Sequence, residues 1–137
     1  MTDLQRFVDA QHGVHERVLA ELAAGEKRTH WMWFVFPQLA GLGRSDMARR
    51  YALASLPEAR DYLAHPVLGP RLRECARTVL AVRDRSAEEI FGTVDATKLR
   101  SSMTLFALAA PDEPVFTEVL ARYFGGEPDP LTAQRLA

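Results

Sequence analysis

The sequence predicts an all-α fold: a single compact bundle of about six or seven short, orthogonally packed helices over residues 1–137. Three observations support this prediction. Apolar residues recur at helical spacing along most of the chain. Residues that favour helix caps precede several of these stretches. Finally, no pair of convincingly alternating apolar and polar runs is present that would form a sheet.

The first helix is expected over residues 3–24. Thr2 and Gln5 have the spacing of a capping box, in which two side chains satisfy free N–H groups at a helix start. Apolar residues then continue at helical spacing until Gly25, a residue type that often ends helices. The polar Gln11 and His15 fall within the same apolar stripe.

Caps, early-turn prolines and glycine stops predict the later helices. Ser45, Ser55 and Ser86 are expected caps, and Asp95 is expected to cap a long helix that is apolar nearly all round in its second half. The expected ranges are 45–51, 55–65, 69–82, 88–91, 95–109 and 114–124, followed by a frayed turn from residue 129.

The segment HWMWFVFPQ at residues 30–38 is the hardest to assign. Its aromatic and β-branched residues favour a strand by propensity. A lone strand would leave buried backbone groups unpaired, however, so residues 30–36 are expected to form a buried helix that Pro37 ends.

Composition and charge exclude several classes of function. Seventeen Lys and Arg residues balance eighteen Asp and Glu residues, so the net charge of −1 provides no broad positive surface for nucleic acid. The longest apolar run, Trp31 to Phe36, is too short to span a bilayer, and the N-terminus lacks a signal pattern. A single cysteine, Cys75, can form no internal disulfide and is expected in the core. We therefore expect a cytoplasmic protein without nucleic-acid or membrane partners.

Polar side chains on the apolar stripe of the first helix need partners. Gln11 and His15 either belong to a satisfied core network or line a pocket, since burying them without hydrogen bonds costs about 1–3 kcal/mol. His12 and His15 have the spacing of two metal ligands, but no third ligand is evident. The sequence thus predicts no metal and no cofactor.

The segment GLGRS at residues 41–45 precedes an expected helix. Its glycines, Arg44 and the Ser45 hydroxyl could cradle a phosphate or carboxylate at the helix N-terminus, where free N–H groups favour an anion. Ordinary turn and cap chemistry explains the same residues. Arg44 is the residue that discriminates between the two interpretations.

Three polar residues near the start of the long helix can meet on one flank. Lys98, Ser101 and Ser102 are spaced i, i+3 and i+4. This spacing fits a Ser–Lys nucleophile pair, a solvated lysine with serines that allow close helix packing, or ligand anchoring. Trp31 and Trp33 are either core aromatics or a stacking surface for a ligand.

Several segments together resemble the bacterial family known as domain of unknown function 1810. These segments are LQRFVDAQ at 4–11, HWMWFVFPQLAGLGRS at 30–45, YLAHPVLGPRL at 62–72, IFG at 90–92 and KLRSSMTLFA at 98–107. The resemblance covers nearly the whole chain and implies a small, mainly α-helical fold. It implies no activity.

Some members of that family carry the name calpastatin, but calpain-inhibitor segments are disordered until they bind, whereas this composition describes a self-sufficient domain. The general arrangement is also similar to that of ADP-ribose-processing NADAR domains. That similarity implies an enzyme acting on a nucleotide or an ADP-ribose-like substrate, although the glutamate-bearing motif of those domains is not matched here.

The polar residues within the family-like segments predict a pocket for a small phosphate- or carboxylate-bearing ligand. Arg44, Lys98 and the helix start at Ser45 would hold the anion, and a tryptophan would form an apolar wall. An enzyme using His15 or His30 as acid or base, and a protein-interaction module, remain alternatives, and the oligomeric state is open. The complete set of predicted site residues is Gln11, His15, His30, Trp31, Trp33, Gln38, Arg44, Ser45, Lys98, Ser101 and Ser102.

Overall fold

A computed structural model describes residues 3–136, and their regular structure is helical, as the sequence predicts. The helices within this range are α1 (Gln5–Gln11), α2 (His15–Ala23), α3 (Met32–Val35), α4 (Asp46–Arg50), α5 (Leu56–Ala64), α6 (Leu68–Ala81), α7 (Ala87–Phe91), α8 (Thr93–Ala109), α9 (Pro114–Phe124) and α10 (Pro130–Leu136). The described residues form ten helices where six or seven were expected. The first expected helix is divided into α1 and α2, and the short segments α3 and α10 add two more helices. The orthogonal packing stays a prediction.

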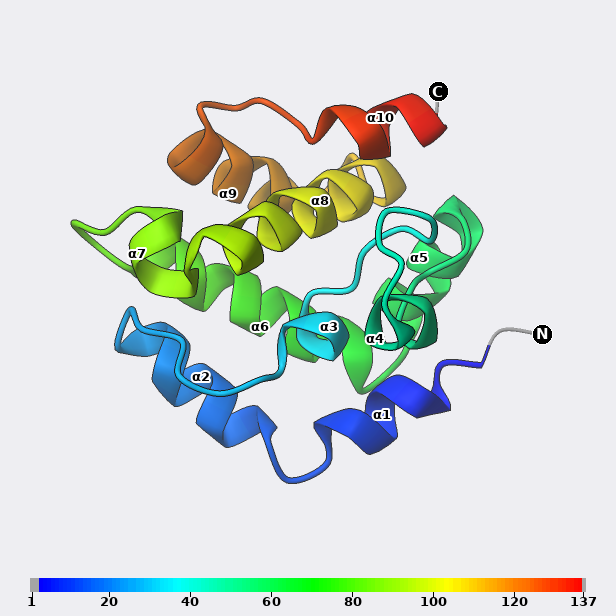
Figure 1. Cartoon of the computed structure of the whole chain (residues 1–137), viewed down its shortest axis with the longest axis horizontal. Helices are drawn as coiled ribbons and strands as arrows, with labels where there is room; N and C mark the ends of the chain where they lie inside the picture. The colour runs from blue at the N-terminus through cyan, green and yellow to red at the C-terminus, as the bar shows by residue number, and fades with distance from the viewer. Residues whose placement is uncertain (1–2, 137) are drawn as a thin grey trace.

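Helix α8 lies at the centre of the fold and contacts α5, α7, α9 and α10 (Figure 1). The six consecutive residues from Ser101 to Phe106 are all buried. Burial around most of the helix explains why its second half is apolar nearly all round, with Leu108 as an exposed exception at 43%. Its first two turns reach the surface, where Val94 is 68% exposed.

The single first helix expected over residues 3–24 is wrong. Helix α1 ends at Gln11 and α2 begins at His15, and between them Gly13 has a φ of +75°. Glycine adopts this left-handed conformation without the steric cost that other residues meet, so the chain can turn there. The apolar stripe continues across the break, which hides it from a periodicity argument. Thr2, the expected cap, lies outside the described residues.

The expected cap at Asp95 is also wrong. Helix α8 begins at Thr93 and its cap is Gly92, whose φ of 82° and ψ of 162° suit glycine alone. Asp95 lies within the first turn of α8, where a carboxylate interacts favourably with the positive end of the helix. Its side chain is therefore available for other partners.

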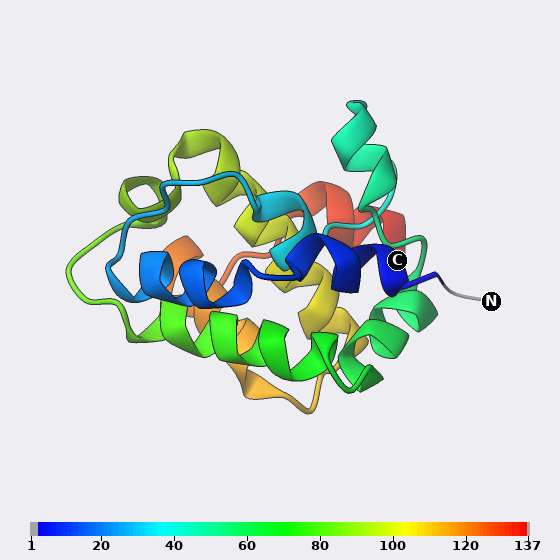
Figure 2. The same cartoon turned by 90° about the horizontal axis from the view of Figure 1, so that it is seen from below.

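The other caps form as predicted. The side chains of Ser45, Ser55 and Ser86 accept hydrogen bonds from the first turns of α4, α5 and α7, and Ser86 forms a complete capping box with Glu89. These interactions are local, which is why sequence spacing finds them. Figure 2 shows α4 projecting from the body of the molecule.

The segment after α2 contains the expected helix before Pro37, but α3 covers only Met32–Val35 of the expected residues 30–36, and two of its four residues are buried. The chain beyond Pro37 makes a single parallel bridge between Leu39 and Leu53, in which the Ala40 N–H donates to the Leu53 carbonyl over 2.7 Å. This bridge joins the two ends of the segment 38–53, which contains α4 and lies on the front of the molecule (Figure 1). In the described range, no helix is long and apolar enough to cross a membrane.

Candidate functional site

A groove of about 350 Å³ lies between the chain that follows α3 and the first two turns of α8. Its volume falls within the range of about 300–1,000 Å³ that is typical of small-ligand pockets. We call it the α3–α8 groove. Its lining residues are Trp33, Gln38, Leu42, Gly43, Thr93, Val94, Thr97 and Lys98.

Lys98 provides the charged group of this lining. Its ammonium nitrogen lies 3.9 Å from the centroid of the Trp33 ring, and 3.1 Å from Oδ1 of Asp95. An ammonium over an indole face is attracted by the negative face of the ring system. The two contacts together fix the ammonium at the edge of the groove.

Asp95 also binds a second lysine. Oδ2 of Asp95 lies 2.9 Å from the ammonium nitrogen of Lys27. The Lys27 side chain is only 7% exposed, and its ammonium nitrogen lies 5.1 Å from the centroid of the Trp31 ring. Burial alone raises the pKa of Asp95, but hydrogen bonds from Lys27 and Lys98 outweigh this effect, so the pKa is lowered. The carboxylate therefore stays ionised between two ammonium groups, and the cluster carries one surplus positive charge.

The start of α8 adds hydrogen-bond donors to the groove. The first intrahelical bond runs from the Ala96 N–H to the Gly92 carbonyl over 2.9 Å, and no side chain caps this end. Thr93 and Val94 line the groove, and as the first residues of the helix their N–H groups have no partner within it. Free N–H groups and the helix dipole favour an anion at such an end.

The structure brings three of the predicted site residues together, namely Trp33, Gln38 and Lys98. Arg44 and Ser45 follow the groove residue Gly43 in the chain, but neither lines the groove. Arg44 is exposed, and the Ser45 hydroxyl accepts a hydrogen bond of 3.1 Å from the Ala48 N–H as the cap of α4.

Gln11 and His15 lie in a different place. They line a small cavity of about 10 Å³, room for about one water, against α6. The buried Gln11 amide donates to the Phe34 carbonyl over 2.7 Å and to the Tyr62 hydroxyl over 3.2 Å. His15 contacts Glu74 with 2.9 Å between Nε2 and Oε1. Both polar side chains thus have protein partners.

Trp31 lies in the core, and its indole N–H donates to Oε1 of Glu21 over 3.0 Å. The same carboxylate accepts hydrogen bonds from the Thr29 hydroxyl and from the N–H groups of Arg28 and Thr29. Burial raises the pKa of Glu21, but these hydrogen bonds outweigh it and lower the pKa to about 2. The neighbouring His30 is exposed and lies outside the groove.

The two serines of α8 are buried within the helix packing. The Ser101 hydroxyl donates to the Thr97 carbonyl over 3.2 Å, and Ser102 is fully buried. Within residues 3–136, the Ser102 hydroxyl is a buried group without a hydrogen-bond partner. The Lys98 ammonium instead donates to Asp95, and the Ser101 hydroxyl is occupied by the helix backbone.

Sequence reasoning missed Lys27 and the role of Asp95. A signal was present, because Lys27 and Lys98 are the two lysines among seventeen basic residues, and Lys27 shortly precedes the segment that carries both tryptophans. Lysine carries a compact charge, unlike the forked guanidinium of arginine. Both lysines meet on Asp95, and each lies over one of the two tryptophans.

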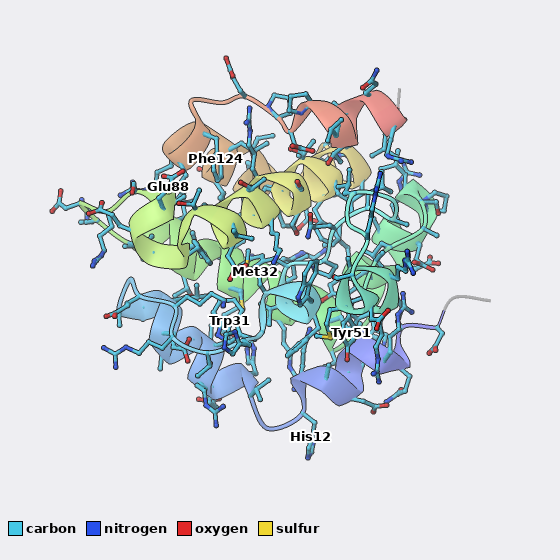
Figure 3. All side chains as sticks on the ribbon, viewed as in Figure 1. His12, Trp31, Met32, Tyr51, Glu88 and Phe124 are labelled. Atoms are coloured by element: carbon cyan, nitrogen blue, oxygen red, sulfur yellow. The ribbon has the colours of Figure 1, made fainter. Side chains whose placement is uncertain are left out.

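The histidine pair considered as a metal site has no third ligand in the part of the chain that the structure describes. His12 points away from the body of the molecule (Figure 3), and no group of three or more His, Cys, Asp or Glu side chains within residues 3–136 is placed to hold a metal ion. Cys75 is 1% exposed, and burial raises the pKa of its thiol to about 12.

Two other hollows are less suited to an organic anion. One of about 400 Å³ is lined by Arg6 and Arg50 together with Asp3 and Asp9, and the Arg6 guanidinium already donates to backbone carbonyls. Another of about 260 Å³ between α8, α9 and α10 has no charged side chain in its lining. The α3–α8 groove combines apolar walls with an ammonium group.

The fold and the groove thus define a small all-helical protein with a candidate ligand site. Residues 1–136 match the family described as "Protein of unknown function (DUF1810)", and the chain belongs to this family. Among solved structures, it is similar to the conserved hypothetical protein Rv1873 from Mycobacterium tuberculosis. The two chains are 56% identical, with a TM-score of 0.96, over 98% of this chain and 96% of the other. A comparison with curated proteins found no match.

Proposed function

We propose that the protein binds a small organic anion, carrying a carboxylate or a phosphate, in the α3–α8 groove. The observation that carries this proposal is the position of the Lys98 ammonium, which lies against Trp33 beside the uncapped start of α8. The ammonium and the N–H groups of Thr93 and Val94 would bind the anionic group.

The remaining lining gives the ligand an apolar part. Trp33, Leu42 and Val94 form the walls, and the Gln38 amide can orient a polar group. A few polar groups among apolar walls are typical of small-ligand pockets. The surplus positive charge of the Lys27, Asp95 and Lys98 cluster supports an anion over a neutral molecule.

Binding without turnover is the form of this function that the groove supports best. Its lining contains no histidine, carboxylate or thiol, and both histidines considered as acid or base lie elsewhere. General acid–base catalysis most often uses such a group, and the titratable side chain of the lining, Lys98, is already paired with Asp95.

The test is an affinity measurement on the wild-type protein and two charge-removing variants. A thermal-shift screen of nucleotides, ADP-ribose, sugar phosphates and small carboxylates identifies a ligand, whose Kd is then measured by calorimetry. Lys98→Met should weaken binding by about 10- to 100-fold, since a hydrogen bond to a charged group contributes about 1.5–3 kcal/mol.

Arg44→Met is the matched control, because it removes the same charge from the turn beside the groove without changing the lining. It should change Kd by less than about threefold, as expected for an exposed charge. Equal losses in both variants, or a loss in Arg44→Met alone, would contradict the assignment of Lys98.

A further inference from the structure

A small void lies directly behind the α3–α8 groove. It measures about 10 Å³ and shares four lining residues with the groove, so these residues form the partition between the two spaces. The shared residues are Trp33, Gln38, Leu42 and Gly43. The void and the groove therefore adjoin at these four residues.

The far walls of this void are mostly apolar and largely buried. They are formed by Leu39, Ala48, Tyr51 and Ala52, and the first three are at most 9% exposed. The ring of Tyr51 packs against Phe7 and Phe34 with centroid distances of 5.7 and 5.5 Å, beside α1 and α4 (Figure 3). No charged side chain lines the void.

The size of the void selects its occupant. A volume of about 10 Å³ admits a group the size of one water or one methyl, and it is too small for a ring. Polar side-chain atoms in the lining come from Trp33, Gln38 and Tyr51, and the aliphatic side chains of the lining give an alkyl end apolar contacts. The charged end of the same ligand would stay at Lys98, on the groove side of the partition.

We infer that the ligand is an unbranched alkyl or acyl chain with an anionic group at one end, whose terminal methyl passes between Trp33 and Leu42 into the void. This inference rests on the proposed function, because it assigns the ligand class of the same groove. It makes Leu42 and Ala48 residues that determine chain-length specificity.

The test uses wild-type protein and the n-alkyl carboxylates from acetate to heptanoate, with Kd measured by NMR titration. Affinity should rise about fourfold for each added methylene until the void is filled, and then stop rising. The Ala48 methyl and Tyr51 ring signals should shift with the longer chains and not with acetate. A branched acid of equal carbon number, 4,4-dimethylpentanoate against heptanoate, should bind at least about tenfold more weakly, because its end is wider than the void.

Two variants change the void in opposite directions. Leu42→Ala removes part of the partition and should move the optimum to longer or branched chains, while Ala48→Val fills the void and should abolish the gain from chain length. Val94→Ala, on the far side of the groove, should change all chain lengths alike.

The outcomes separate this inference from the proposed function. If the carboxylates bind with Lys98-dependent affinity but chain length and branching have no effect, the inference is wrong and anion binding stands. If none of the carboxylates binds while another anion binds at Lys98, the alkyl class is also wrong. If no anion binds at all, both proposals fail.

Discussion

Glu21 illustrates what one buried side chain does in this protein. Its carboxylate collects hydrogen bonds from the loop between α2 and α3 and from the Trp31 indole. The Lys27 ammonium lies over the Trp31 ring and forms an ion pair with Asp95 at the start of α8. A carboxylate on α2 thus helps to position the charged cluster beside the groove.

Glu21→Gln should lower the free energy of unfolding at pH 7 by about 1–3 kcal/mol, because the amide keeps one acceptor oxygen but loses the other and the negative charge. The pKa of Glu21 is about 2 in the folded protein against an ordinary value of 4.5. The stabilisation is therefore complete above pH 4.5 and is lost as the pH falls toward 2. Urea unfolding at pH 7 and pH 3 should show a smaller difference between variant and wild type at pH 3.

Glu118→Gln provides the control for this experiment, since Glu118 is an exposed acid on α9. Its effect should stay within about 0.5 kcal/mol at both pH values. An equal loss in the two variants, or a Glu21→Gln effect that does not depend on pH, would show that the carboxylate of Glu21 has no special role.

The sequence could indicate which polar and aromatic residues belong to a site, but not how they are arranged in space. Trp33, Gln38 and Lys98 were predicted from polar and aromatic positions that packing does not require, and they do line one groove. Glu21 gave no comparable signal, because acidic residues are usually exposed. Its burial depends on the position of the loop after α2, which the sequence does not give.

At the scale of elements, the start of α8 decides what the groove can bind. Gly92 turns the chain with a φ of 82° and leaves the first N–H groups of the helix free of side-chain caps. Sequence reasoning placed the cap at Asp95, because aspartate is a stronger cap signal than glycine. Cap signals were correct for Ser45, Ser55 and Ser86, whose hydroxyls accept hydrogen bonds from the first turns of their helices.

Gly92→Ala should reduce both stability and ligand affinity. A Cβ at Gly92 would meet no atom within 4 Å, so the cost comes from the backbone conformation and should be about 1–3 kcal/mol. Relaxing that strain would move the N–H groups of Thr93 and Val94 and weaken anion binding. Thermal unfolding and calorimetric titration measure the two effects.

Gly13→Ala is the matched control, because Gly13 has a similar φ of +75° with open space around it, between α1 and α2. It should destabilise the protein without changing the Kd of the anion. Wild-type affinity in Gly92→Ala would mean that the start of α8 takes no part in binding.

At the scale of the whole molecule, long-range packing separates residues that the sequence presents together. Gln11 and His15 meet α6, Trp31 meets Glu21, and Trp33 meets Lys98. Helical periodicity predicts which side chains share a face of one helix, but it does not predict which faces meet. The all-α class was therefore predictable, whereas the division of one expected pocket into a groove and a separate cavity was not.

The most direct test of the account is an NMR map of where a small carboxylate binds. Butyrate titrated into ¹⁵N-labelled wild-type protein should shift the amide signals of Thr93, Val94 and Lys98 and the indole signal of Trp33, and Lys98→Met should remove these shifts. Shifts confined to the hollow beside Arg6 and Arg50, or to the cavity beside Gln11, would contradict the assignment of the α3–α8 groove as the anion site.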